Sequence, residues 1–340
     1  MEERKPRILY LDALRLFATF AVIFIHISSP GHRSFINADN AENLCVGGNL
    51  LCISKLIAYS VYNKLSHWAV PMFLMISGAV FLRPEKVVTI KYVFQKLIPR
   101  LAVPYFFWWL FYALVLCLFC VASDVQISFD MFKPYSHLWF LPMLMGIYLI
   151  IPLLKIIVAN RVLMRYFLGL WVFFTLLESL PCVNVIFDTM HVNFFMGYSG
   201  YFVLGYFLFS TEFCSKKIIY FVGMLAALAA VLVDVMGKLF SFSILNSNTP
   251  LMIAIATALF VWFKHKDWSS KASLLCKLQP YLFGIYLIHV VFVLVFTKEP
   301  LYGMIHPAIY IPSAVFIVFI ISYGCIWVLY KIPYIRKVVE

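Results

Sequence analysis

Residues 8–28 read ILYLDALRLFATFAVIFIHIS, a run long and apolar enough to cross a membrane as one helix. Asp12, Arg15 and His26 interrupt it. Arg15 and His26 are eleven residues apart, close to three helical turns, so both project from one face, about 16 Å apart along the axis. Ionisable groups in a membrane-spanning helix are costly and usually mark function. We therefore expect the chemistry of the protein along this stripe.

The composition is that of a polytopic membrane protein. Of the 340 residues, 64% are hydrophobic and 12% are charged, and the mean hydropathy is +0.94. These values exclude a soluble globular domain. Hydropathy and loop breaks predict an all-α fold of about ten transmembrane helices, with one membrane domain over residues 1–340. The expected spans are 8–28, 53–82, 103–122, 137–159, 162–180, 194–209, 218–236, 250–263, 280–296 and 312–330.

The basic residues gather at alternate junctions between these spans. One side holds 20 of the 27 Lys and Arg residues, and the positive-inside rule makes that side cytoplasmic, together with both termini. Positive-inside loops and contact with anionic lipids account for most of the net charge of +12 without a nucleic-acid partner. Cys45 and Cys52 fall on the outer side, where both a disulfide and buried free thiols remain open.

Four histidines at or within the expected spans predict a polar cavity. His26 ends the first span on the outer side, where a neutral imidazole can take a proton from a hydroxyl. An interfacial histidine hydrogen-bonded to a neighbouring helix is the alternative. His67, His137 and His289 are the other three. Because no pair of them has the close spacing of metal ligands, no metal is expected.

Arg15 has two possible roles. Asp12 precedes it by three residues, a spacing that permits a salt bridge within the membrane. The other role is catalysis together with His26. Since three turns separate these two side chains, they serve one reactant only if the helix bends or the reactant is elongated. A thioester carried on a long slender arm fits the spacing.

The segment QKLIPRLAVPY, residues 95–105, places Lys96 and Arg100 at the cytoplasmic end of the third span. Its prolines loosen the backbone. Cations there can meet phosphates arriving from the cytosol, and binding of lipid headgroups is the alternative. Ser77 and Trp139 are further candidates for the cavity lining, and Ser77 lies too near the cytoplasmic end to be the expected nucleophile.

Several motifs follow one another over most of the chain. They are YLDALR at 10–15 with ten residues before His26, AVPMFLMISG at 69–78, the 96–104 segment, HLWFL at 137–141, YFVLG at 201–205 and GIYLIH at 284–289. The ordered set resembles the acyltransferase 3 family, membrane acyltransferases that modify bacterial surface glycans. Two positions depart from the family pattern. Leu16 stands where a Gly often follows the first-span Arg, and Leu97 occupies the first position of an Arg-x-x-Arg motif, where Lys96 offers a substitute charge.

The resemblance implies an acyl-CoA donor, usually acetyl-CoA, as co-substrate with no bound cofactor. The implied acceptor is a hydroxyl of a cell-surface or lipid-linked saccharide. His26 and Arg15 match the family's Arg-x10-His signature, with the His expected to be essential, and Arg100 matches the motif associated with the donor. In size the chain is similar to stand-alone enterobacterial common antigen O-acetyltransferases and to O-succinyltransferases of exopolysaccharides. The resemblance also implies a multi-pass protein of the bacterial cytoplasmic (inner) membrane.

We therefore predict an O-acyltransferase with His26 as general base and with Arg15 and Asp12 beside it in the catalytic set. Its expected partners are acyl-CoA, a glycan acceptor and membrane lipids. A transporter or flippase of a lipid-linked glycan would also need a polar cavity in the membrane. However, transporters often carry matched broken helices in two halves, and the sequence has no matched pair. A degenerate member kept as a structural partner is the third possibility.

Overall fold

The computed structural model describes residues 7–37, 49–122, 137–179, 197–239, 250–298 and 301–340. Every element within these ranges is a helix, as the sequence predicts. The helices are α1 (Leu9–Asn37), α3 (Leu50–Lys64), α4 (Ala69–Phe81), α5 (Ile90–Tyr92), the π-helix η1 (Val93–Leu97), α6 (Ile98–Ala122), α7 (Phe140–Leu149), α8 (Ile151–Ala159), α9 (Arg161–Glu178), α11 (Ser199–Ser210), α12 (Lys216–Leu239), α13 (Pro250–His265), the 3₁₀-helix η4 (Ser269–Lys271), α14 (Ala272–Phe296), α15 (Leu301–Met304), α16 (Pro307–Leu329) and α17 (Pro333–Val339).

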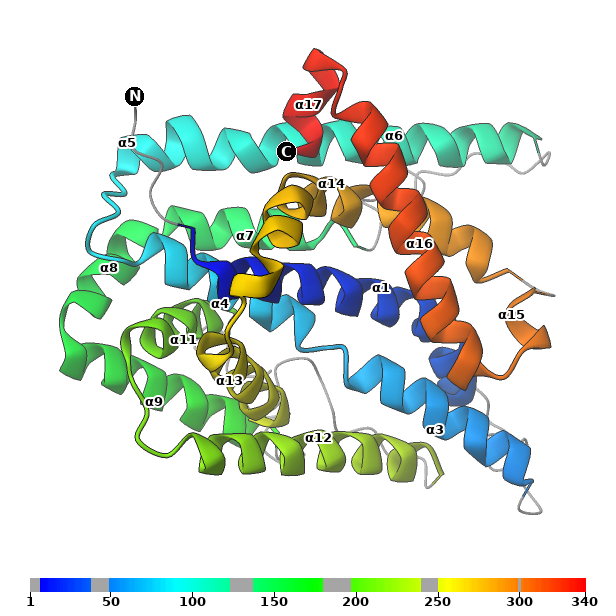
Figure 1. The fold of residues 1–340 in the computed structure, drawn as a ribbon, viewed down its shortest axis with the longest axis horizontal. Coiled ribbons are helices and arrows are strands. Elements are labelled where there is room, and N and C mark those ends of the chain that lie inside the picture. The colour runs from blue at the N-terminus through cyan, green and yellow to red at the C-terminus, as the bar shows by residue number, and fades with distance from the viewer. Residues whose placement is uncertain (1–6, 38–48, 123–136, 180–196, 240–249, 299–300) are drawn as a thin grey trace.

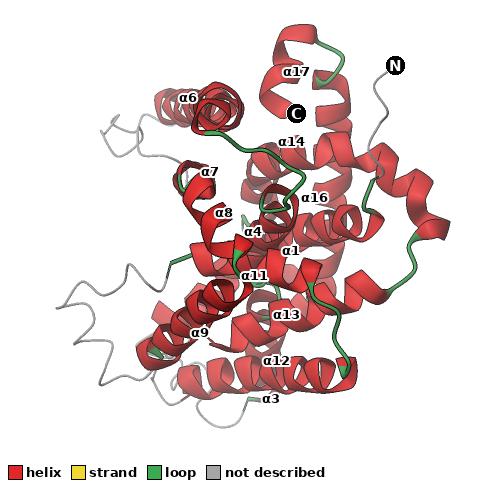
Figure 2. Ribbon diagram, turned by 90° about the vertical axis from the view of Figure 1, so that its left-hand side faces the viewer, coloured by secondary structure: helices red, strands yellow, loops and turns green. Residues whose placement is uncertain are grey.

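Helix α1 runs through the middle of the bundle, with α6 on one side of it and α12 on the other (Figures 1 and 2). It contacts α3, α4, α13, α14 and α16. Leu14, Ile23 and Ile27 of this helix are fully buried. A helix that crosses the core in this way must find polar partners inside the protein for each of its polar side chains.

Helix α1 is longer than the expected 8–28 span because Pro30 does not end it. A proline within a helix removes the hydrogen bond to the carbonyl four residues earlier, which here is the carbonyl of His26. The hydroxyls of Ser28 and Ser29 donate to the carbonyl of Ile25, at 3.2 and 2.6 Å. The helix therefore continues to Asn37, with altered backbone bonding around His26.

The described residues of the ten expected spans are mostly helical, but the helices differ in length from the predicted spans. Six stretches of the described chain are long and apolar enough to cross a membrane: Leu9–Ser34, Leu50–Phe81, Ile90–Cys117, Lys216–Leu239, Ser269–Phe296 and Pro307–Leu329. Helices α7 and α8 form a further pair bent by 57°, and α11 and α13 are apolar but short. Ten complete spans and the side of the termini thus stay predictions.

Two of the expected spans are broken. Residues 65–68 form turns between α3 and α4, and His67 lies in this break. The bend between α7 and α8 follows Leu149, and Pro152 lies in the first turn of the second helix of that pair. Cys52, near the start of α3, is disulfide-bonded, while Cys45 lies outside the described residues. The first break brings a histidine into the interior on irregular backbone.

Helices α4 and α11 touch backbone to backbone, because a glycine stands at each contact. A Cβ atom on Gly78 would overlap the carbonyl oxygen of Phe202. A Cβ atom on Gly205 would overlap the backbone of Met75 in the same way. Small residues allow membrane helices to approach this closely. The contact fixes α4, which supplies one wall of the site described below.

The Gly78→Ala variant is therefore expected to lower the thermal unfolding temperature of the protein in detergent, since overpacking costs about 1–3 kcal/mol. Gly169→Ala in α9 is the matched control, because no described heavy atom lies within 4 Å of its Cβ position. Alanine there should leave stability unchanged or raise it by up to about 1 kcal/mol. Equal unfolding temperatures for the two variants would contradict the close contact.

Candidate active site

A cavity of about 560 Å³ lies against the first half of α1. Four cationic side chains and two acidic ones line it: Arg7, Arg15, Lys86, Arg100, Asp12 and Glu340. Thr19, one turn after Arg15, lines it too, so the polar stripe expected on this helix faces the cavity over Asp12–Thr19. The excess of positive charge suits an anionic ligand, and guanidinium groups are well shaped for phosphate.

Arg15 is held by α14 as well as by its own helix. Its Nη1 lies 3.4 Å from Oδ1 of Asp12 and donates to Oε1 of Gln279 at 2.8 Å. Gln279 in turn donates from Nε2 to the backbone carbonyl of Asp12 at 2.7 Å. The predicted Asp12–Arg15 salt bridge is thus one part of a lock between α1 and α14. With 36% of its side chain exposed, Arg15 keeps surface free within the cavity.

An aromatic wall ends the cavity on the side away from Arg7. Phe73 of α4, Phe140 of α7 and Tyr286 of α14 all line it. The ring centroids of Phe73 and Phe140 are 5.9 Å apart, and Tyr286 lies 6.4 and 5.9 Å from them. Ile76 and Leu144 are also part of the lining. The cavity therefore combines a cationic portion with an apolar, aromatic one.

Three histidines meet behind this wall. The ring centroids of His26 and His289 are 5.2 Å apart, those of His137 and His289 5.6 Å, and those of His26 and His137 6.3 Å. Tyr286 touches both His137 and His289, with centroids 6.0 Å away in each case. Because Tyr286 also lines the cavity, its side chain borders both the cavity and two of the three histidines.

Backbone carbonyls hold two of these rings in place. His289 Nδ1 lies 2.7 Å from the carbonyl oxygen of Tyr286, and His137 Nε2 lies 3.2 Å from that of Leu287. The hydroxyl of Tyr286 donates to the carbonyl of His137. The two histidines are almost fully buried, whereas His26 is only half-buried. No three His, Cys, Asp or Glu side chains in the described part of the chain are placed to hold a metal ion.

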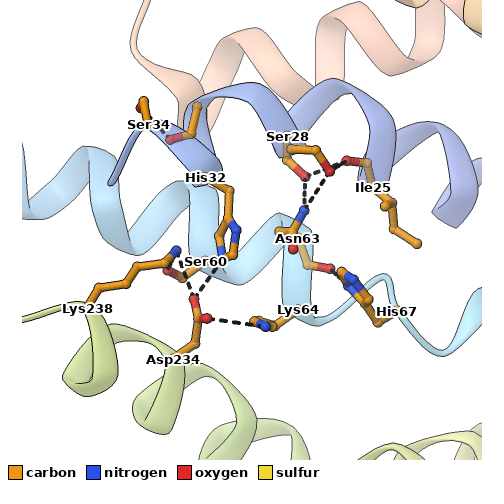
Figure 3. A network of polar contacts seen from close by, with 12 residues as sticks. Ile25, Ser28, His32, Ser34, Ser60, Asn63, Lys64, His67, Asp234 and Lys238 are labelled. Carbon is orange, nitrogen blue, oxygen red and sulfur yellow. Dashed lines mark hydrogen bonds and ion pairs between the residues drawn. The ribbon is translucent and has the colours of Figure 1, made fainter. Parts of the chain in front are cut away.

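His67 reaches the same region from the break between α3 and α4. Its Nδ1 lies 2.7 Å from the carbonyl oxygen of Asn63. The amide of Asn63 donates to the hydroxyls of Ser28 and Ser29, at 3.1 and 3.2 Å (Figure 3). One buried asparagine thus connects His67 to the turn of α1 that follows His26.

The remaining predicted site residues take different positions. Arg100 lines the cavity, but Lys96 is exposed on the π-helix η1 and is not part of the lining. Leu97, which stands where the family motif has an Arg, does line it. Ser77 also lines the cavity, and its hydroxyl donates to the carbonyl of Phe73 at 2.9 Å. Trp139 is 43% exposed and packs against Tyr198.

Sequence reasoning missed a second buried polar cluster, centred on Asp234 of α12. Its carboxylate lies 2.9 Å from His32 Nε2, 3.3 Å from Lys64 Nζ and 3.1 Å from Lys238 Nζ (Figure 3). Lys238 Nζ also lies 3.4 Å from the hydroxyl of Ser60. The cluster joins α12 to α1 and α3. Asp234 and Lys238 stand four residues apart in an apolar run, a spacing that marks a helical ion pair.

Comparison with known proteins identifies the family. A family model for an acyltransferase domain, that of the acyltransferase 3 family, matches residues 8–330, nearly the whole chain. The chain therefore belongs to the acyltransferase 3 family and is a membrane acyltransferase. No curated protein and no solved structure matches it.

Removing the central carboxylate should destabilise the bundle. Asp234→Asn leaves Lys238 and His32 buried without their anion, and the loss of one partner from a buried ion pair costs about 3–5 kcal/mol. A clear drop in the thermal unfolding temperature in detergent is the expected result.

Glu212→Gln is the matched control for this experiment. Glu212 lies between α11 and α12, 2.9 Å from Lys264 Nζ, and its side chain is 77% exposed. Hydrogen bonds from Lys264 and His265 lower the pKa of Glu212, so it is ionised at neutral pH and forms a true ion pair. Exposed pairs contribute about 0–1 kcal/mol, so this variant should unfold near the native temperature. Similar losses in both variants would show that burial of Asp234 is not the cause.

Proposed function

We propose that the protein transfers an acyl group, in the first place acetyl, from acyl-CoA to a hydroxyl of a cell-surface or lipid-linked glycan, with His26 as general base. The observation that carries the proposal is the position of Tyr286, which lines the cationic cavity and also touches His137 and His289, the two histidines next to His26. A long anionic donor and a proton acceptor thus meet at one point.

The cationic portion of the cavity suits the donor. Arg7, Arg15, Lys86 and Arg100 supply the charges that phosphates require, and no covalent or metal cofactor is needed for this binding. The pantetheine arm would then pass along the stripe of α1 from Arg15 towards His26. An arm that extends from Arg15 to His26 is an elongated reactant, as the spacing of these two residues requires if both serve it and the helix does not bend.

The reaction uses one proton, which moves from acceptor to leaving group. His26 takes the proton from the sugar hydroxyl as its oxygen attacks the thioester carbonyl. The tetrahedral intermediate collapses, the carbon–sulfur bond breaks, and the protonated His26 returns the proton to the thiolate. The products are the O-acyl sugar and free CoA thiol, and neither a metal nor a covalent acyl-enzyme is required by this sequence.

The apolar wall favours acetyl over succinyl as the acyl group. Phe73, Phe140 and Tyr286 surround the part of the cavity nearest the histidines, with Ile76 and Leu144 beside them. A succinyl group carries a carboxylate, and an anion in apolar surroundings needs a paired cation. None of these five side chains can supply one.

We place the glycan on the outer side of the bacterial inner membrane. The distribution of Lys and Arg favours this orientation, and a disulfide at Cys52 fits an outer end of α3, since disulfides persist in oxidising compartments. Lipid headgroups would contact the basic inner loops. Membership of an acyltransferase family favours an enzyme over the transporter or flippase with which the polar cavity alone would also agree.

The direct test follows free thiol release by the purified protein in nanodiscs, with acetyl-CoA or succinyl-CoA and a mixture of lipid-linked and free glycans. Native protein should release thiol only with acceptor present, and faster with acetyl-CoA. His26→Ala should lower the rate roughly 100- to 10,000-fold, the usual contribution of a general base. Equal rates in the two proteins would remove His26 from the mechanism, and product mass would identify the acyl group.

A second test separates the two cations assigned to the donor. Arg100→Ala should raise the KM for acetyl-CoA roughly 10- to 100-fold with a smaller change in kcat, because a charge-assisted hydrogen bond contributes about 1.5–3 kcal/mol. Lys96→Ala is the matched control: it removes an exposed cation four residues away that does not line the cavity. Its KM should change less than about threefold. The reverse order of effects would mean that the phosphates bind outside the cavity.

A further inference from the structure

The neutral tautomer of His289 follows from its hydrogen bond. Its Nδ1 lies 2.7 Å from a backbone carbonyl, which only accepts hydrogen bonds, so Nδ1 carries the proton. The neutral ring therefore has its lone pair on Nε2. This atom is fully buried and has no hydrogen-bond partner among the described residues. A buried acceptor without a donor is costly, which indicates that a donor binds there during function.

His137 has the complementary arrangement. Its Nε2 lies 3.2 Å from the carbonyl of Leu287, so Nε2 carries the proton and the lone pair is on Nδ1. In both His137 and His289, a backbone carbonyl thus fixes the proton on one ring nitrogen. The other ring nitrogen of each can then only accept a hydrogen bond while the ring is neutral. Neither can donate to an oxyanion from that nitrogen while neutral. His26 is the third histidine of the cluster, and its ring can offer an N–H to such an acceptor.

His26 is close enough to supply it. Within the described part of the chain the His26 ring has no hydrogen-bond partner. Its centroid lies 5.2 Å from that of His289, with the two ring planes tilted by 53°. The rings are not hydrogen-bonded as they stand, since Nε2 of His289 has no partner among the described residues, and a turn of the His26 ring would form the bond. The centroid of His137 is farther away, at 6.3 Å. His289 is therefore the better placed acceptor.

We propose that His289 is a positioning residue for His26: its Nε2 accepts the ring N–H of His26 and so leaves the second nitrogen of His26 as the lone pair that takes the proton of the acceptor hydroxyl. This inference rests on the proposed function. The role equals that of the carboxylate in a Ser-His-Asp triad, which fixes the tautomer of its histidine and stabilises the imidazolium. A neutral imidazole performs it here without placing a carboxylate in the membrane.

The pH dependence gives a signature of this role. Protonated His26 would keep its hydrogen bond to His289 and strengthen it, so His289 favours the charged state. His67, His137 and His289 face His26 from the α3–α4 break, the segment before α7, and α14, and Arg33 of α1 adds a positive charge. Loss of the acceptor at His289 should therefore move the acid limb of the rate profile to lower pH.

The test compares His289→Asn with His289→Gln in the thiol-release assay with acetyl-CoA, as kcat and KM across pH. The Asn amide can keep the donation to the Tyr286 carbonyl but does not extend to the position of Nε2, whereas the longer Gln can place its oxygen there. We expect Asn to lower kcat about 100-fold or more, with the acid limb shifted and the donor KM unchanged. Gln should stay within about tenfold of native.

Each result decides the matter. Equal kcat values for Asn, Gln and native protein, or equal losses with an unshifted acid limb, would overturn the positioning role. Thermal unfolding of both variants removes a folding defect from the comparison. His26→Ala is assayed alongside: if it is inactive while both His289 variants match native protein, the positioning role fails and the proposed function stands. If His26→Ala matches native protein, the general base and the role of His289 both fail.

Discussion

The side-by-side packing of α1 and α14 is the contact on which the site depends. Arg15 and the Asp12 carbonyl bond to Gln279, and His26 meets His289 farther along the same two helices. The two contacts are eleven residues apart on α1 and ten on α14, so the helices run in the same direction in register. Hydrogen bonds between two helices are favourable in a membrane interior, because a polar side chain there has no water to bond. The packing of α1 against α14 thereby positions residues of both the cavity and the histidine cluster.

The part of this arrangement that is local in sequence could be predicted. The 3.6-residue period predicted one face with Arg15 and His26, and the spacing of three residues predicted the pair of Asp12 and Arg15. Asp12 and Arg15 line the cavity, whereas His26 is not part of its lining. Apolar runs predicted an all-helical fold, which the described residues confirm. The breaks were not predicted, since hydropathy treats α3 and α4 as one run, although the turn around His67 separates them.

The part of the site that depends on contacts between distant segments could not be predicted from the sequence. Gln279 is uncharged and lies outside the motifs, so no pattern marks it, yet it accepts a hydrogen bond from Arg15. Tyr286 lies within the GIYLIH motif, but its position between the cavity and two histidines follows only from the packing of the helices. The meeting of His26 with His289 follows from the packing of segments more than 260 residues apart. Asp234 differs, because its spacing from Lys238 was present in the sequence as a signal and was not used.

The glycine contacts between α4 and α11 also determine which parts of the barrier can move. Two helices in backbone contact at Gly78 and Gly205 cannot slide past one another without breaking that contact, so they act as one rigid body. Phe73 belongs to this body. Tyr286 instead stands on α14 and is tethered through a single hydroxyl. The wall between the cavity and the histidines therefore joins a side chain of this rigid pair to one from a different helix.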